Sequence, residues 1–212
     1  MLTRKDLAFI QKDLSRFDEV REEILSLSRV AIRLSGSAIL EIHRGDMRAA
    51  SASLQQAEKV LVKIDELSRG FAELRSSQGV IVAFQEFVEA VALRTYVERR
   101  TIPSLKDVRS NPRSYMLGLL DAIGEFRRMS LNSLRRGEVE NAEKLLGLME
   151  GIYEDLQSLE HTAIVPTFRV KMDSARRIIE TTRGDVVTEM RRYSLEKALI
   201  RLDKRLGSRQ KG

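Results

Sequence analysis

Apolar residues recur at intervals of three and four along most of the chain, the spacing of amphipathic helices. The first such run predicts a long helix with apolar positions Leu7, Ile10, Leu14, Phe17, Val20, Ile24, Leu27, Ala31, Leu34, Ala38 and Ile42. The sequence His43-Arg44-Gly45-Asp46 ends this helix. A second helix is expected from about Met47 to about Leu74, and Arg75–Gly79 separates it from a third.

The three prolines, Pro103, Pro112 and Pro166, fall between the later apolar runs and mark breaks. Further helices are expected from about Ser114 to Arg136 and from about Val139 to Leu159. After Pro166, one helix should reach about Thr182 and a basic last helix about Leu206. No alternating strand pattern occurs, so the sequence predicts an all-α, single-domain bundle of six to seven helices over residues 1–206, with a flexible tail at 207–212.

An Arg-Gly-acid sequence occurs three times, at Arg44–Asp46, Arg136–Glu138 and Arg183–Asp185. Each predicts a turn in which glycine ends one helix and the acid begins the next. The spacing between them is too long for the ~34-residue helical repeat, and the residues between them do not match. These segments are therefore interpreted as helix ends rather than as a tandem repeat.

The segment from Val80 to Val97 is apolar on nearly every face of a helix. Two carboxylates, Glu86 and Glu89, lie near its middle and would be costly in a bilayer, so we expect a central core helix instead of a membrane span. At 100° per residue the two carboxylates project from one face. Asp121 and Glu125 form a second pair, four residues apart on the next long helix, where Gly118 and Gly124 would allow close helix approach.

Four carboxylates on two core helices suit a hard divalent cation, Mg²⁺ or Mn²⁺, which could activate water toward a phosphodiester. The alternative is a structural ion-pair network in which Arg128, with Arg94 or Arg127, neutralises the acids. The spacing alone leaves both interpretations open. A di-iron bundle is disfavoured because no Glu-x-x-His pair is present.

Composition excludes several other chemistries. The chain has no cysteine, and its two histidines, His43 and His161, cannot build a zinc site alone. No Walker or dinucleotide glycine loop occurs. The N-terminus lacks the apolar core of a signal peptide, which predicts a cytoplasmic protein.

The positive charge is concentrated at one end of the chain. The net charge is +6, and residues 161–212 hold 13 Lys and Arg against 6 Asp and Glu. A local basic excess favours a polyanionic partner, although the basic side chains of the last helix (Arg191, Arg192, Arg201, Lys204 and Arg205) could equally form a solvated face. Aromatic residues are few and mostly at core-like spacing, so base stacking should not dominate recognition.

Three segments together resemble the translin family, and within it the TRAX (translin-associated factor X) branch and its single-chain archaeal relatives. They are Phe84–Ala90, Tyr115–Glu125 and Met129–Ser133, with Gly137 shortly after. The resemblance implies an all-α bundle that assembles into hollow shells, as an octamer or hexamer. It also implies that Glu86, Glu89, Asp121 and Glu125 match the acidic catalytic motif of a Mg²⁺-dependent endoribonuclease.

With this resemblance, the sequence favours a metal-dependent endoribonuclease that cleaves single-stranded RNA, with DNA as a further substrate. The four acids are expected to hold Mg²⁺ or Mn²⁺, and Arg128, Arg127 and Arg94 are candidates for nucleic-acid binding. The main alternative is a non-catalytic, translin-like protein that binds single strands. A helical scaffold without a nucleic-acid role is a third hypothesis, and it predicts binding with little salt dependence.

Overall fold

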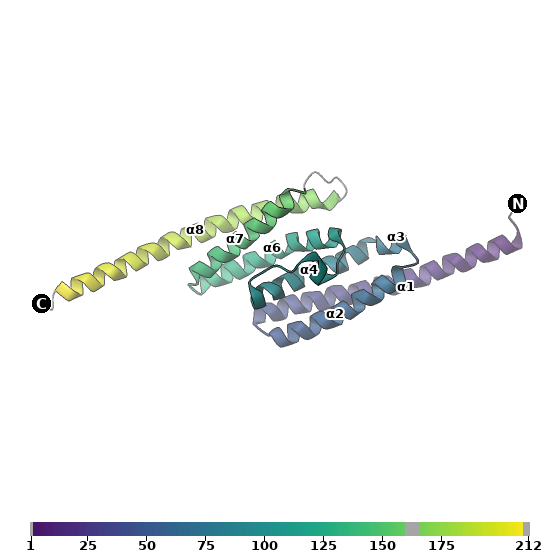
Figure 1. The fold of residues 1–212 in the computed structure, drawn as a ribbon, viewed down its shortest axis with the longest axis horizontal. Coiled ribbons are helices and arrows are strands. Elements are labelled where there is room, and N and C mark those ends of the chain that lie inside the picture. The colour runs from purple at the N-terminus through teal and green to yellow at the C-terminus, as the bar shows by residue number, and fades with distance from the viewer. Residues whose placement is uncertain (1, 160–165, 210–212) are drawn as a thin grey trace. The chain divides into compact units, whose positions relative to one another are not determined.

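The computed structural model describes residues 2–159 and 166–209 of the chain (Figure 1). Over these residues the regular structure consists of helices without a strand, which confirms the all-α prediction. The helices are α1 (Arg4–Arg44), α2 (Met47–Ser68), α3 (Ala72–Arg75), α4 (Gln78–Arg99), α5 (Leu105–Val108), α6 (Pro112–Arg135), α7 (Val139–Gln157) and α8 (Pro166–Arg209).

The chain divides into two compact units, residues 1–122 and residues 123–212. Helix α6 begins in the first unit and ends in the second. The predicted single domain over residues 1–206 stays a prediction. His161 and the break before Pro166 lie outside the described residues, as do residues 210–212 of the expected tail. Helix α8 includes residues 207–209, so the helix ends later than the sequence pattern indicated.

The first unit is built from α1, α2 and α4, which contact one another. Small residues line the buried face of α1 at Ser28, Ala31, Ser35 and Ala38, and α2 buries Ala50 and Ala57. Small side chains let helix backbones approach closely. Helix α4 is buried on most of its surface, which confirms the expected central core helix.

Two of the three predicted glycine turns are present. Gly45 ends α1 with φ 83°, and the Asp46 side chain accepts a hydrogen bond from the Ala49 amide at 2.9 Å. Gly137 has φ 76° after α6, but the Glu138 side chain pairs with Arg136 at 2.8 Å instead of capping α7. Glycine reaches this left-handed region without the steric cost that other residues pay.

The second helix is shorter than predicted. Helix α2 ends at Ser68 rather than near Leu74, and the chain turns before the four-residue helix α3. Gly70 lies in this turn and is a poor helix former. Phe71 then packs edge-on against Phe17 of α1, with ring centroids 5.6 Å apart. The end of α2 thus coincides with a poor helix former and with a contact between residues distant in sequence.

The second unit contains α7, α8 and the part of α6 that follows Ala122. Helices α7 and α8 are in contact and bury Leu145, Met149, Met172 and Ile179. The Ser130 hydroxyl of α6 donates to the Ala142 carbonyl of α7 at 3.2 Å. This bond helps to fix the C-terminal part of α6 against α7.

The predicted turn at Arg183–Asp185 is wrong, because α8 continues through Gly184. Thr182 and Val186 are buried, and the Arg183 guanidinium pairs with the Glu150 carboxylate of α7 at 2.7 Å. These contacts hold both sides of Gly184 in helical conformation. They offset the cost of about 1 kcal/mol that one glycine imposes on a helix interior.

Both long terminal helices carry exposed apolar residues. On α1 these include Leu7, Ile10 and Leu14, and on α8 they include Leu195, Leu199 and Leu202. None of the helices in the described part of the chain is long and apolar enough to cross a membrane. Helix α4, which contains the long apolar segment, lies in the first unit and buries ten of its residues there.

Candidate acidic site

Glu86 and Glu89 lie on α4, where both side chains are half-buried. The residues around them on this helix, including Ala83, Phe87, Val88 and Ala90, are buried. Their spacing of three residues places the two carboxylates on one side of the helix. The structure thus keeps the predicted acidic pair on the most buried helix of the first unit.

The start of α6 is fixed to α4 by specific contacts. The Ser114 hydroxyl donates to the Ile81 carbonyl at 3.1 Å. One turn later, a Cβ atom at Gly118 would lie 2.5 Å from the Gln85 carbonyl oxygen and 2.7 Å from the Val88 Cβ. The predicted close approach at Gly118 is confirmed, because only a glycine fits against the α4 backbone there.

Asp121 lies further along this same contact. The buried side chain of Gln85 donates from Nε2 to the Asp121 carboxylate. Glu89 follows Gln85 by four residues, so the two side chains are only ~40° apart around α4. The structure therefore brings Asp121 to the side of α4 that carries Glu89.

Glu125 belongs to the second unit and lies one turn after Asp121 on α6. Its carboxylate pairs with the Arg128 guanidinium at 3.5 Å, the contact that the ion-pair alternative predicted. At Gly124, a Cβ atom would meet no atom of the described residues within 4 Å. The predicted close approach of another helix is thus absent at this second glycine.

The three candidate nucleic-acid-binding arginines differ in what they contact. Arg94 pairs with Glu98 on its own helix at 3.0 Å. Arg127 donates to the Thr182 hydroxyl at 2.9 Å and lies 3.5 Å from the Asp185 carboxylate, so it joins α6 to α8. Half of the Arg128 side chain surface is exposed, at 50%. Of the three, Arg128 has the most exposed side chain.

The four acids of the candidate site match a hard cation in their chemical type. All four predicted ligands are carboxylates, which Mg²⁺ and Mn²⁺ prefer. Among residues 2–159 and 166–209, no group of three or more His, Asp or Glu side chains is arranged to hold a metal ion.

Gln85 is the residue that the sequence interpretation missed. It is polar on an apolar helix and precedes Glu86 directly, yet it offers no carboxylate and so carried no metal-binding signal. Its exposed fraction is 7%, and a buried amide requires a hydrogen-bond partner. That requirement could have pointed to an acid on a neighbouring helix, which is Asp121.

Comparisons with known proteins agree with this architecture. The family model described as the Translin family matches residues 19–181. An uncharacterized protein of Methanocaldococcus jannaschii is 32% identical, over 93% of this chain and 88% of its own. The translin-associated protein X homolog of Schizosaccharomyces pombe is 24% identical, over 72% of this chain and 71% of its own.

Solved structures show the same fold. The crystal structure of apo-NeC3PO has a TM-score of 0.80 and 26% identity, covering 89% of this chain and 98% of the other. The structure of AfC3PO in complex with duplex RNA has a TM-score of 0.81 and 31% identity, covering 87% and 96%. With a family match across most of its length and these structural relatives, the chain belongs to the translin family.

Proposed function

We propose that the protein is a Mg²⁺-dependent endoribonuclease that cleaves single-stranded RNA through Glu86, Glu89, Asp121 and Glu125. The observation that carries this proposal is the contact of Asp121 with Gln85, which sets a carboxylate of α6 against the acidic side of α4. The relative AfC3PO was solved with duplex RNA, which supports RNA as the ligand class. Because the chain has a net charge of +6, DNA, which is also a polyanion, is a second ligand that it could bind.

The chain's own residues have distinct roles in this proposal. Glu86, Glu89, Asp121 and Glu125 hold the cation, directly or through water, and one of these carboxylates orients the attacking water. Bound Mg²⁺ supplies Lewis-acid stabilisation of the phosphate. Gln85 fixes the orientation of Asp121, and Arg128 contacts a phosphate of the strand.

The test is cleavage of labelled RNA, single-stranded and duplex, in Mg²⁺ and in EDTA. Glu89→Gln and Asp121→Asn remove charge with little change in volume, and each should lower the cleavage rate by roughly 100-fold or more. Glu98→Gln is the matched control, because Glu98 lies on the same helix and pairs only with Arg94 among the described residues. Cleavage that persists in EDTA or in both active-site variants contradicts the proposal.

The second candidate is a non-catalytic protein that binds single-stranded RNA or DNA. The Glu125–Arg128 pair favours it, because this acid is already neutralised by an arginine. This candidate requires equal binding with Mg²⁺ and with EDTA, and no cleavage of any strand. The binding assay on the same variants therefore separates the two functions.

We also propose that the protein assembles into a homo-oligomer, as an octamer or hexamer. Leu7, Ile10 and Leu14 on α1 are exposed at helical spacing, as are Leu195, Leu199 and Leu202 on α8. Exposed apolar stripes of this kind are usually covered by another subunit. The C3PO structures described above share the fold on which this assembly would be built.

A further inference from the structure

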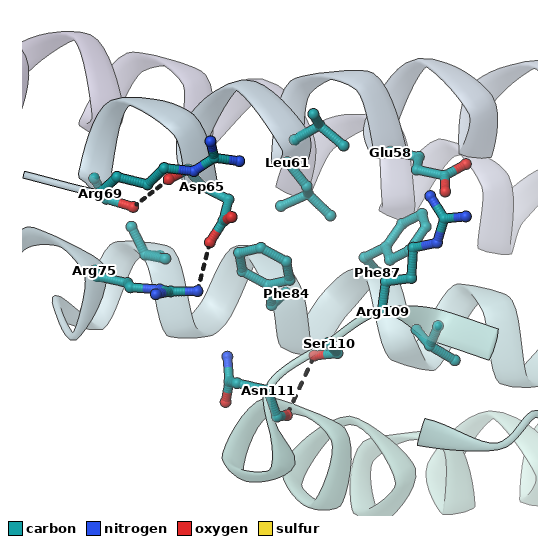
Figure 2. A pocket seen from close by; sticks show the side chains of 14 residues that line it. Glu58, Leu61, Asp65, Arg69, Arg75, Phe84, Phe87, Arg109, Ser110 and Asn111 are labelled. Atoms are coloured by element: carbon teal, nitrogen blue, oxygen red, sulfur yellow. Dashed lines mark hydrogen bonds and ion pairs between the residues drawn. The ribbon is translucent and has the colours of Figure 1, made fainter. Parts of the chain in front are cut away.

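A pocket of about 370 Å³ lies in the first unit, between α2, α4 and the segments around α3 and α5 (Figure 2). Phe84 and Phe87 contribute to it from α4. These two residues lie on the side of α4 roughly opposite to Glu86 and Glu89, as the 100° turn per residue requires. The pocket is therefore separate from the acidic site.

The floor of the pocket is apolar and includes one accessible aromatic ring. Leu61 and Phe87 are buried, whereas Phe84 is half-buried and its ring stands in the middle of the pocket in Figure 2. A half-buried phenylalanine that faces a cavity can stack on a planar ligand. The volume is in the range of pockets that hold small organic molecules, ~300–1,000 Å³.

One end of the pocket is cationic. Arg69 and Arg75 lie there with Asp65, whose carboxylate pairs with the Arg75 guanidinium at 2.8 Å (Figure 2). Arg69 forms no ion pair within 4.0 Å in the described part of the chain. Two guanidinium groups against one carboxylate leave a net positive end that suits a phosphate.

The other end offers both kinds of hydrogen-bonding group. Glu58 supplies an acceptor and Arg109 supplies donors, and their side chains lie near each other in Figure 2. Arg109 has φ 51°, a left-handed conformation that is uncommon for a residue other than glycine. The edge of a nucleobase carries donors and acceptors together, so this end is matched to it.

We propose that this pocket binds a nucleoside monophosphate, with its base on Phe84 and its phosphate at Arg69 and Arg75. The base edge then faces Glu58 and Arg109. The same chemistry is present in a free nucleotide and in the 5′-phosphorylated end of an RNA strand. The proposal does not depend on cleavage by the acidic site, because the two sites use different faces of α4.

The test is calorimetric titration of the full-length protein in EDTA, which prevents metal-dependent cleavage. The probes are AMP, adenosine, inorganic phosphate, and an oligoribonucleotide with a 5′-phosphate or a 5′-hydroxyl. AMP should bind more tightly than adenosine or phosphate. If the 5′-phosphorylated strand competes with AMP and the 5′-hydroxyl strand does not, the ligand is a strand end; if neither strand competes, it is a free nucleotide.

Three variants separate the contributions of charge and ring. Arg69→Gln should weaken AMP binding roughly tenfold and leave adenosine unchanged, because it removes a charge-assisted contact to phosphate. Asp65→Asn should strengthen AMP binding, because it frees Arg75 from its ion pair. Phe84→Leu should weaken AMP and adenosine alike, by roughly fivefold or more, because it removes the stacking surface.

Arg100→Gln is the matched control. Arg100 is exposed, as Arg69 is, but it does not line the pocket. Its AMP affinity should equal that of the unmodified protein. Failure of AMP to bind at millimolar concentration overturns the proposal, as does equal AMP affinity in the Arg69→Gln and Arg100→Gln proteins. Glu89→Gln should leave AMP binding unchanged, which distinguishes this proposal from that of the acidic site.

Discussion

At the scale of single residues, neighbouring arginines on one helix have different surroundings. Arg127 and Arg128 are adjacent on α6, yet Arg127 bonds to Thr182 of α8 and Arg128 pairs only with Glu125 among the described residues. The Arg127 side chain is 26% exposed and the Arg128 side chain 50%. We infer that the first residue is structural and that the second can contact RNA.

Substitution of Arg127 should therefore affect stability, whereas substitution of Arg128 should affect RNA binding. Arg127→Gln is expected to lower the free energy of unfolding by about 1–2 kcal/mol, because the Thr182 hydroxyl and Asp185 lose a partner. Arg128→Gln should leave stability nearly unchanged and weaken RNA binding, with a shallower dependence of affinity on salt. Urea unfolding and binding at several salt concentrations measure both. Equal loss of RNA affinity in the two variants would contradict this assignment.

Tyr115 provides a pH-dependent contact at the start of α6. Its hydroxyl donates to the Pro103 carbonyl at 2.8 Å, and burial raises the pKa of the tyrosine, with a smaller contribution from Asp107. A raised pKa in the folded state means that the protonated form is favoured by folding. The resulting stabilisation is fully present below the pKa of the unfolded tyrosine, about 10, and is lost as pH rises through the folded value.

The Tyr115→Phe variant should lack this alkaline loss. Its free energy of unfolding is expected to fall less steeply above about pH 10 than that of the unmodified protein. At neutral pH it should be less stable, because the bond to Pro103 is missing. Thermal unfolding as a function of pH tests this, with Tyr193→Phe as the control tyrosine. Parallel alkaline profiles for the unmodified protein and Tyr115→Phe would show that Tyr115 has no such role.

At the scale of helices, the approach of α6 to α4 depends on one glycine. The space at Gly118 is filled by the backbone oxygen of Gln85 and by Val88, and neither can move without shifting α4. The same approach positions Gln85 to donate to Asp121. Gly118, which has no side chain, thus allows the close approach of α6 to α4 that brings Asp121 to Gln85.

Gly118→Ala is expected to destabilise the protein by about 1–3 kcal/mol, because the added methyl group overpacks the α4 contact. Gly124→Ala on the same helix is the control, since a Cβ atom there meets nothing within 4 Å among the described residues. It should be neutral or stabilising by up to about 1 kcal/mol, from helix propensity alone. Denaturant unfolding of both variants tests the contrast. Similar midpoints for the two would mean that α6 does not approach α4 at Gly118.

At the scale of the whole molecule, the exposed apolar stripe of α8 is the feature that a monomer does not explain. Leu195, Leu199 and Leu202 follow one another at helical spacing and are 62%, 57% and 54% exposed. A single exposed leucine is ordinary, whereas a row of them on one helix favours a partner helix. We expect a second copy of the chain to cover this stripe.

Leu199→Glu should therefore shift the protein to species of lower mass without unfolding it. The charge is costly only where the side chain becomes buried between subunits. Light scattering should show a mass well above the 24.2 kDa of one chain for the unmodified protein, and a lower mass for the variant. Val170→Glu is the control, because Val170 is 67% exposed and the residues three and four positions after it, Asp173 and Ser174, are polar. A monomeric unmodified protein at micromolar concentration would rule out the closed assembly.

The sequence by itself determined the helical class, the ends at Gly45 and Gly137, and the placement of the acidic pairs on two helices. These features depend on residues three or four positions apart, or on the backbone freedom of one glycine. Because such interactions are local, they follow directly from the amino-acid sequence. The turn predicted at Gly184 shows the limit of this information. Buried neighbours and the Arg183–Glu150 pair keep that glycine inside α8.

Only the tertiary structure decided which distant residues share a surface. It placed Gln85 against Asp121 and Arg127 of α6 against Thr182 of α8. It also gathered Phe84, Arg69 and Arg109 from separate segments around one pocket. Helical periodicity shows which face of a helix is apolar but not which neighbour covers it. The partner is chosen by packing between helices, which depends on the shape and volume of side chains far apart in the chain.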